Sequence, residues 1–114
     1  MSSPITTHIL DTAHGKPASG VTVTLEYRDT SGAFVQVGTG VTDADGRLRT
    51  LLSNDAFRGG TYRLTFDVRG YQSAHGEQGF FPEVTIAFFV GDTTQHYHVP
   101  LLLSPFGYST YRGS

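Results

Sequence analysis

Short runs of alternating hydrophobic and polar residues recur along this chain at intervals of about ten residues. Alternation with a period of two places every second side chain on one face of an extended strand. The clearest runs cover 21–27 and 61–68, where Val, Leu, Tyr and Phe alternate with Thr, Glu, Arg and Asp. Further strands are predicted over 5–10, 34–41, 47–52, 84–90 and 96–103, with a turn and a second short strand in the final residues.

The residues between these runs are typical of an antiparallel β-sandwich or barrel. The chain of 114 residues contains 14 glycines and 5 prolines, dispersed between the runs, as expected for many short strands joined by turns. Gly38 and Gly40 predict a bend or bulge within 34–41. One short helix is predicted over 71–75, too short to be stable alone. We therefore predict an all-β fold of about eight strands, in a single domain spanning residues 1–114.

Composition excludes several classes of function. The formal net charge of −2 argues against nucleic-acid binding and against a polybasic membrane anchor. No apolar run approaches the roughly 20 residues of a membrane-spanning helix. The chain has no cysteine, which excludes disulfides, thiolate metal sites and a thiol nucleophile. The first four residues are too short and polar for a secretory signal, so we expect a cytoplasmic protein, or a periplasmic one if a signal peptide has been removed.

The strand predicted over 84–90 is apolar on both faces. Val84, Ile86, Phe88 and Val90 form the inward face, and the opposite face also carries Phe89. A sandwich strand with two apolar faces usually packs against a second partner. We therefore expect subunits to associate through this strand.

Three histidines lie on strand faces opposite the predicted core. His96 and His98 share one face of their strand, and His8 lies on the outer face of the first strand. Such histidines are most often solvated or hydrogen-bonded, but this set can also supply three ligands to zinc. The residues alone leave both interpretations open.

The segment 43–46 (Asp-Ala-Asp-Gly) resembles the start of a calcium-binding loop. It lacks the closing glutamate and the flanking amphipathic helices that such a loop requires. We interpret it as a glycine-containing turn that leads into Arg47. His14, in the loop after the first strand, is given no catalytic role.

The final segment carries a resemblance to a known family. Residues 96–105 (His-Tyr-His-Val-Pro-Leu-Leu-Leu-Ser-Pro) and the Tyr-Arg-Gly-Ser ending at 111–114 resemble the C-terminal signature of the 5-hydroxyisourate hydrolases, the enzyme branch of the transthyretin-like family. The block around His8 (Thr-His-Ile-Leu-Asp-Thr-Ala) resembles the opening motif of this family. Arg47 matches the arginine of its second block, so the resemblance covers nearly the whole chain.

This resemblance implies a transthyretin-like sandwich of two four-stranded sheets with one short helix. It also implies a homotetramer, a dimer of dimers, with its sites in a channel between the dimers. The implied reaction is hydrolysis of 5-hydroxyisourate to 2-oxo-4-hydroxy-4-carboxy-5-ureidoimidazoline in urate catabolism, without a metal or another cofactor.

The resemblance also assigns roles to individual residues. His98 is the expected base and His8 its partner, while Arg47 stabilises the developing oxyanion as an electrophilic clamp. Ser114 is expected to position the substrate or a histidine through its hydroxyl or the terminal carboxylate. Substrate binding is expected to involve Arg47 together with the tail residues Tyr111, Arg112, Gly113 and Ser114, with Arg112 as the second clamp.

Two other functions remain open on fold alone. Transthyretin itself is a carrier, so a transthyretin-like carrier of small aromatic ligands in the tetramer channel is the main alternative. A plain β-sandwich module of a larger surface protein is the third reading. A carrier channel needs apolar walls, whereas His8, Arg47 and His98 together favour the hydrolase.

Overall fold

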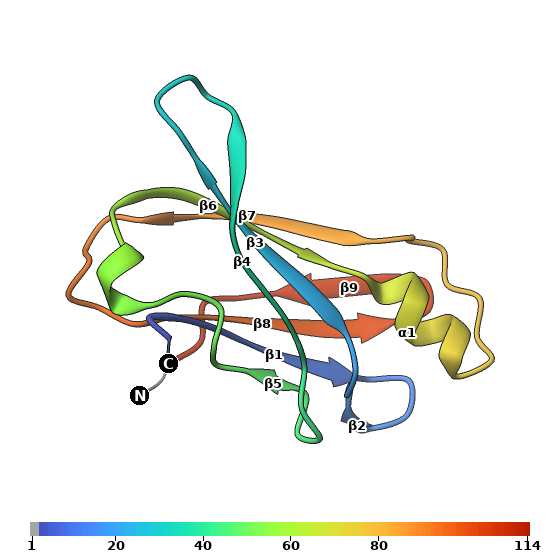
Figure 1. Ribbon diagram of the computed structural model, residues 1–114. Coiled ribbons are helices and arrows are strands. Elements are labelled where there is room, and N and C mark those ends of the chain that lie inside the picture. The colour runs from blue at the N-terminus through green and yellow to red at the C-terminus, as the bar shows by residue number, and fades with distance from the viewer. Residues whose placement is uncertain (1–2) are drawn as a thin grey trace.

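The computed structural model describes residues 3–114 and shows two β-sheets facing each other (Figure 1). The first sheet contains β1 (Ile5–Asp11), β2 (Lys16–Pro17), β5 (Arg47–Leu48), β8 (Tyr97–Ser104) and β9 (Gly107–Thr110). The second sheet contains β4 (Phe34–Val41), β3 (Thr22–Arg28), β6 (Gly60–Phe66) and β7 (Val84–Val90), in that spatial order. The two-sheet β-sandwich predicted from the sequence is therefore confirmed, but the first sheet has five strands and not the implied four, because β5 also pairs with β1, which gives nine strands over the described residues.

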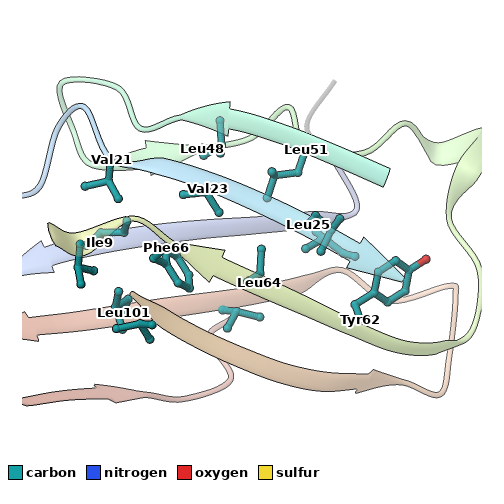
Figure 2. Packing of buried hydrophobic residues seen from close by; sticks show 14 of the residues in the cluster. Ile9, Val21, Val23, Leu25, Leu48, Leu51, Tyr62, Leu64, Phe66 and Leu101 are labelled. Atoms are coloured by element: carbon teal, nitrogen blue, oxygen red, sulfur yellow. The ribbon is translucent and has the colours of Figure 1, made fainter. Parts of the chain in front are cut away.

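The core lies between the sheets and follows the alternation of the sequence. Val23, Leu25, Leu64 and Phe66 from the second sheet are fully buried, and Figure 2 shows them packed toward side chains of the first sheet such as Leu101. Full burial of one such side chain stabilises the fold by about 1.5–3 kcal/mol. These contacts hold the first sheet in place, so that its outer face is a rigid surface.

One pair of strands departs from the antiparallel arrangement of the rest. β1 and β8 run parallel, with Thr6 opposite His98 and His8 opposite Pro100, and they lie side by side in Figure 1. The sequence pattern predicts the faces of strands but not the direction in which two distant strands meet. This register brings residues from both ends of the chain together.

The segment predicted as a strand over 47–52 forms a ladder only at β5, so the strand prediction is wrong beyond Leu48. The chain instead crosses close over β4, where the carbonyl of Leu51 occupies the space that a side chain at position 38 would need. Gly38 therefore permits the crossing. The register of β3 against β4 shifts here, which confirms the predicted bulge.

The helix prediction is correct in kind but wrong in its start. The α-helix α1 covers Val68–Ala74, three residues earlier than the start predicted at 71. Asp67 caps it by accepting a hydrogen bond from the Gly70 amide at 3.0 Å, so Val68 belongs to the helix and not to β6. A short 3-10 helix, η1, covers Asn54–Ala56. No helix within residues 3–114 has the length and apolarity needed to cross a membrane.

Candidate active site

A small polar pocket of about 140 Å³ lies on the side of the first sheet that faces away from the core. Its walls combine hydroxyl, imidazole and guanidinium groups. The residues that line it are Thr6, Thr7, Arg47, Arg49, His96, His98 and Ser114. This is a site for a polar, hydrogen-bonding ligand.

Strand pairing brings these residues together. The parallel register of β1 and β8 sets Thr6 opposite His98. The antiparallel pairing of β1 with β5 sets His8 opposite Arg47. An isolated bridge between His98 and Gly113 then ties the C-terminal tail to β8. Three strands and the tail thus converge on one face.

Thr6 contacts two histidines, His98 on β8 and His96 directly before that strand. Its Oγ1 lies 2.8 Å from Nδ1 of His98 and 3.0 Å from Nε2 of His96. The two imidazole rings are nearly parallel, with an interplanar angle of 20° and centroids 6.4 Å apart. Because Nδ1 of His98 is engaged by Thr6, Nε2 is the nitrogen left to act in the pocket.

The surroundings of His98 favour its neutral form. Burial lowers the pKa of its imidazole, and the neighbouring Arg47 guanidinium lowers that pKa further. His96, His8 and Arg49 act in the same direction. A neutral imidazole keeps a lone pair at neutral pH, which a general base requires.

His8 lies beside the pocket without lining it. Its Nε2 lies 2.9 Å from the carbonyl oxygen of Asp45. A carbonyl can only accept, so Nε2 donates and the lone pair of neutral His8 is on Nδ1. Burial and then Arg47 lower the pKa of His8, against opposing effects of the Asp45 carbonyl and of the Asp43 and Asp45 carboxylates.

The turn before β5 sets the position of Arg47. One carboxylate oxygen of Asp43 accepts hydrogen bonds from the amides of Asp45, at 2.9 Å, and Arg47, at 3.0 Å. Gly46 adopts a φ of +73° and its carbonyl accepts from the Ile9 amide at 2.8 Å, a conformation that glycine adopts without strain. The interpretation of 43–46 as a glycine-containing turn is confirmed.

The tail residues divide into two groups. Gly113 donates its amide to the His98 carbonyl at 2.8 Å, and Ser114 reaches the pocket. Arg112 turns away: it donates to Oε1 of Gln95 at 2.8 Å, and its guanidinium lies 4.4 Å from the Tyr97 ring centroid. Tyr111 is 57% exposed. In the single chain the structure thus brings together Arg47, His98 and Ser114, next to His8, and leaves Tyr111 and Arg112 outside the pocket.

Three residues of the pocket were not predicted from the sequence, Thr6, Thr7 and Arg49, and His96 was considered only as a possible zinc ligand. His96 shares a face with His98 through simple alternation, and Arg49 follows Arg47 at the same spacing, so the pattern offered a signal for both. Thr6 offered no such signal, because its place depends on the parallel pairing of strands.

The three histidines do not converge as a zinc site. Within residues 3–114, the one group of three potential ligands with its donor atoms close together is Asp11, His14 and Glu77. There His14 already joins two carboxylates, with Nδ1 at 2.8 Å from Asp11 and Nε2 at 3.3 Å from Glu77. These contacts connect the loop after β1 to the segment that follows α1.

Comparison with known proteins gives the family of this chain. The family model described as HIUase/Transthyretin family matches residues 5–113. The chain belongs to this family. It is similar to the 5-hydroxyisourate hydrolase of Salmonella typhi, with 47% identity over 113 residues, which are 99% of this chain and 82% of that protein. The family predicted from the sequence motifs is confirmed.

Solved structures similar to this chain include a transthyretin and a hydrolase. Sea bream transthyretin in complex with thyroxine matches with a TM-score of 0.92 and 34% identity, covering 96% of this chain and 94% of that chain. Klebsiella pneumoniae 5-hydroxyisourate hydrolase matches with a TM-score of 0.83 and 37% identity, covering 96% and 98%. Both show the transthyretin fold, so within the HIUase/Transthyretin family the residues of the pocket must decide the function.

Proposed function

We propose that this protein hydrolyses 5-hydroxyisourate to 2-oxo-4-hydroxy-4-carboxy-5-ureidoimidazoline in urate catabolism. The observation that carries the proposal is the imidazole of His98, which is hydrogen-bonded to Thr6 and faces the same pocket as two arginines, in surroundings that lower its pKa. A base beside fixed cations is the arrangement that activates water and stabilises an oxyanion. The similarity to proteins named 5-hydroxyisourate hydrolase supports the same conclusion.

In this reaction His98 acts as the base. Its Nε2 takes a proton from water, and the water oxygen attacks a carbonyl carbon of the six-membered lactam ring. The carbonyl oxygen becomes negative as the carbon becomes tetrahedral. The C–N bond then breaks and the leaving nitrogen receives the proton. A well-placed base typically contributes a factor of about 10²–10⁴ to such a reaction.

The arginines bind the substrate and stabilise the transition state. Arg47 is partly buried and lines the pocket with Arg49, and a planar guanidinium can hold a carbonyl-rich ring through two hydrogen bonds. Both cations also favour the negative charge that forms on the carbonyl oxygen. Ser114 completes the wall and supplies a hydroxyl for orientation.

His8 assists from the edge of the site. With Nε2 held by the Asp45 carbonyl, its Nδ1 is the atom that can orient the water or the leaving nitrogen. Gly113 fixes the position of His98 through the backbone. Tyr111 and Arg112 can contact substrate only from a neighbouring subunit or after the Arg112 side chain leaves Tyr97.

We further propose that the active form is a homotetramer, a dimer of dimers. β7 and β9 are the outermost strands of their sheets, and such strands offer unpaired backbone groups to a partner. Phe89 on β7 is 69% exposed, and Tyr108 on β9 is 42% exposed. The pocket of about 140 Å³ is also smaller than the roughly 300 Å³ of typical ligand sites, so a neighbouring subunit would complete its walls.

The alternative is a carrier of small aromatic ligands, as in the sea bream structure with thyroxine. The observation in its favour is the high structural similarity. The lining of the pocket speaks against it, because arginine and histidine side chains replace the apolar walls that a hydrophobic ligand needs.

The test generates 5-hydroxyisourate from urate with urate oxidase in the cuvette and follows its ultraviolet absorbance, with a chelator present throughout. We expect the intermediate to decay much faster with the protein than without it. Decay at the spontaneous rate by folded, tetrameric protein would contradict the proposal. Calorimetric titration with thyroxine would then test the carrier.

A further inference from the structure

We propose that Thr6 is a positioning residue that connects His98 to His96 as a proton relay. The inference rests on the proposed function, because it describes how the base of that reaction is held and reset. It concerns a residue inside the first sheet that the substrate does not need to touch.

Thr6 is built into this position rather than placed there by chance. It is 4% exposed, and β1 is paired with β8 along its whole length. Its hydroxyl lies 2.8 Å from one imidazole and 3.0 Å from the other. A buried hydroxyl with two close imidazole nitrogens is a connection between them.

A hydroxyl has a single proton, so it can donate to only one of the two rings at a time. In the first arrangement Nδ1–H of His98 donates to Thr6, and Thr6 donates to Nε2 of His96. His98 then presents a lone pair at Nε2 and is a base. In the second arrangement Nε2–H of His96 donates to Thr6, and Thr6 donates to Nδ1 of His98. His98 then carries its proton at Nε2 and is an acid.

The relay moves one positive charge through two short steps. Water gives a proton to Nε2 of His98, while its O–H bond breaks. The Nδ1 proton of His98 passes to the Thr6 oxygen, and the original hydroxyl proton passes to Nε2 of His96. His96 becomes the imidazolium and His98 is neutral again. The reverse transfer returns the proton to His98 when its Nε2–H protonates the leaving nitrogen.

His96 is suited to hold the charge between these steps. Its side chain is exposed, whereas His98 is half-buried and close to Arg47. Water stabilises an exposed imidazolium better than the pocket stabilises a charge beside a guanidinium. The relay therefore keeps positive charge from accumulating on His98 during turnover.

The first test compares two substitutions at position 6. Thr6→Val keeps the shape and removes the hydroxyl, and Thr6→Ser keeps the hydroxyl. We expect Thr6→Val to lower kcat about tenfold or more with KM little changed, and Thr6→Ser to restore most of kcat. Thr12→Val is the matched control, since it removes a hydroxyl bonded to the Leu103 carbonyl outside the pocket. Wild-type kcat in Thr6→Val would overturn the relay.

The second test needs no substrate. Nitrogen-15 NMR of the imidazoles reports the tautomer of each histidine. We expect neutral His96 and His98 to carry their protons on the same ring nitrogen in the wild type, both on Nδ1 or both on Nε2, with this match lost in Thr6→Val. Unchanged spectra in Thr6→Val would overturn the relay. Lack of turnover by the wild type would instead overturn the proposed function, so the two failures are distinct. If Thr6→Val does not fold, His96→Asn tests the same step, and unchanged kcat there would overturn the relay.

Discussion

The amide of Gly113 donates to the carbonyl of His98 at 2.8 Å, and the His98 ring leaves no room for a side chain at position 113. A Cβ at position 113 would lie 2.6 Å from Cδ2 of His98, closer than real Cβ atoms approach other atoms. Glycine is therefore required for the tail to lie flat against the imidazole. The backbone of the tail and the ring of the proposed base form one unit.

This contact predicts the effect of Gly113→Ala. The added methyl group must displace either the His98 ring or the tail, so we expect kcat to fall at least about tenfold, since misplacement by a fraction of an ångström is costly in a catalytic site. Steady-state kinetics and thermal unfolding measure this. Gly107→Ala is the control, because its Cβ would have 3.8 Å of space to the nearest atom. Equal kcat in the two variants would contradict the packing argument.

Arg47 should affect the pH profile as well as the rate. It lowers the pKa of both His98 and His8, so removing its charge should raise these pKa values toward the ordinary value. We expect Arg47→Ala to lower kcat by about 10² and to move the acid limb of the kcat/KM profile to higher pH. Arg47→Lys keeps the charge and should leave that limb in place. An unshifted limb in Arg47→Ala would show that Arg47 does not control the base.

The lowered histidine pKa values also predict how stability depends on pH. The unfolded chain takes up protons near pH 6.5, whereas folded His98 and His8 resist protonation. Their contribution to the free energy of unfolding is therefore complete above that pH and is lost as the pH falls below it. Urea unfolding between pH 5 and 8 measures how steeply the free energy of unfolding changes with pH around the ordinary histidine pKa of about 6.5. The double variant His8→Asn, His98→Asn should show a shallower slope, and an identical slope would contradict this assignment.

Stability and catalysis should separate at Tyr71. Its hydroxyl donates to the buried carboxylate of Asp11 at 2.8 Å, and neither residue lines the pocket. Tyr71→Phe leaves this carboxylate without one of its donors, so we expect a loss of about 1–3 kcal/mol in the free energy of unfolding and no change in kcat. Urea unfolding gives the first quantity and the absorbance assay the second. Ser73→Ala, at an exposed position of the same helix, is the control and should change neither.

The alternation of the sequence predicted the core well, because period-two burial is a local property. Val23, Leu25, Leu64 and Phe66 are apolar members of the runs 21–27 and 61–68, and all four are fully buried. The start of α1 was predicted wrongly because the alternation continues to Val68, whereas the capping hydrogen bond of Asp67 begins the helix there.

The candidate site was predictable only in part. Arg47, His98 and Ser114 were named from motifs and line the pocket. Thr6 could not be predicted, because its contact with His98 spans 92 positions and depends on a parallel register. Arg112 was expected to bind substrate, but the flat face of Tyr97 and the amide of Gln95 hold it elsewhere in the single chain.

The most direct test of the proposed mechanism compares His98→Asn with His75→Asn in the absorbance assay for 5-hydroxyisourate. His75 ends α1 and donates to the Tyr71 carbonyl, outside the pocket, and asparagine is well tolerated at helix ends. We predict that His98→Asn reduces turnover by at least about 10², with the fold intact, and that His75→Asn keeps wild-type turnover. Near-normal turnover by His98→Asn would contradict the central claim that this imidazole is the base.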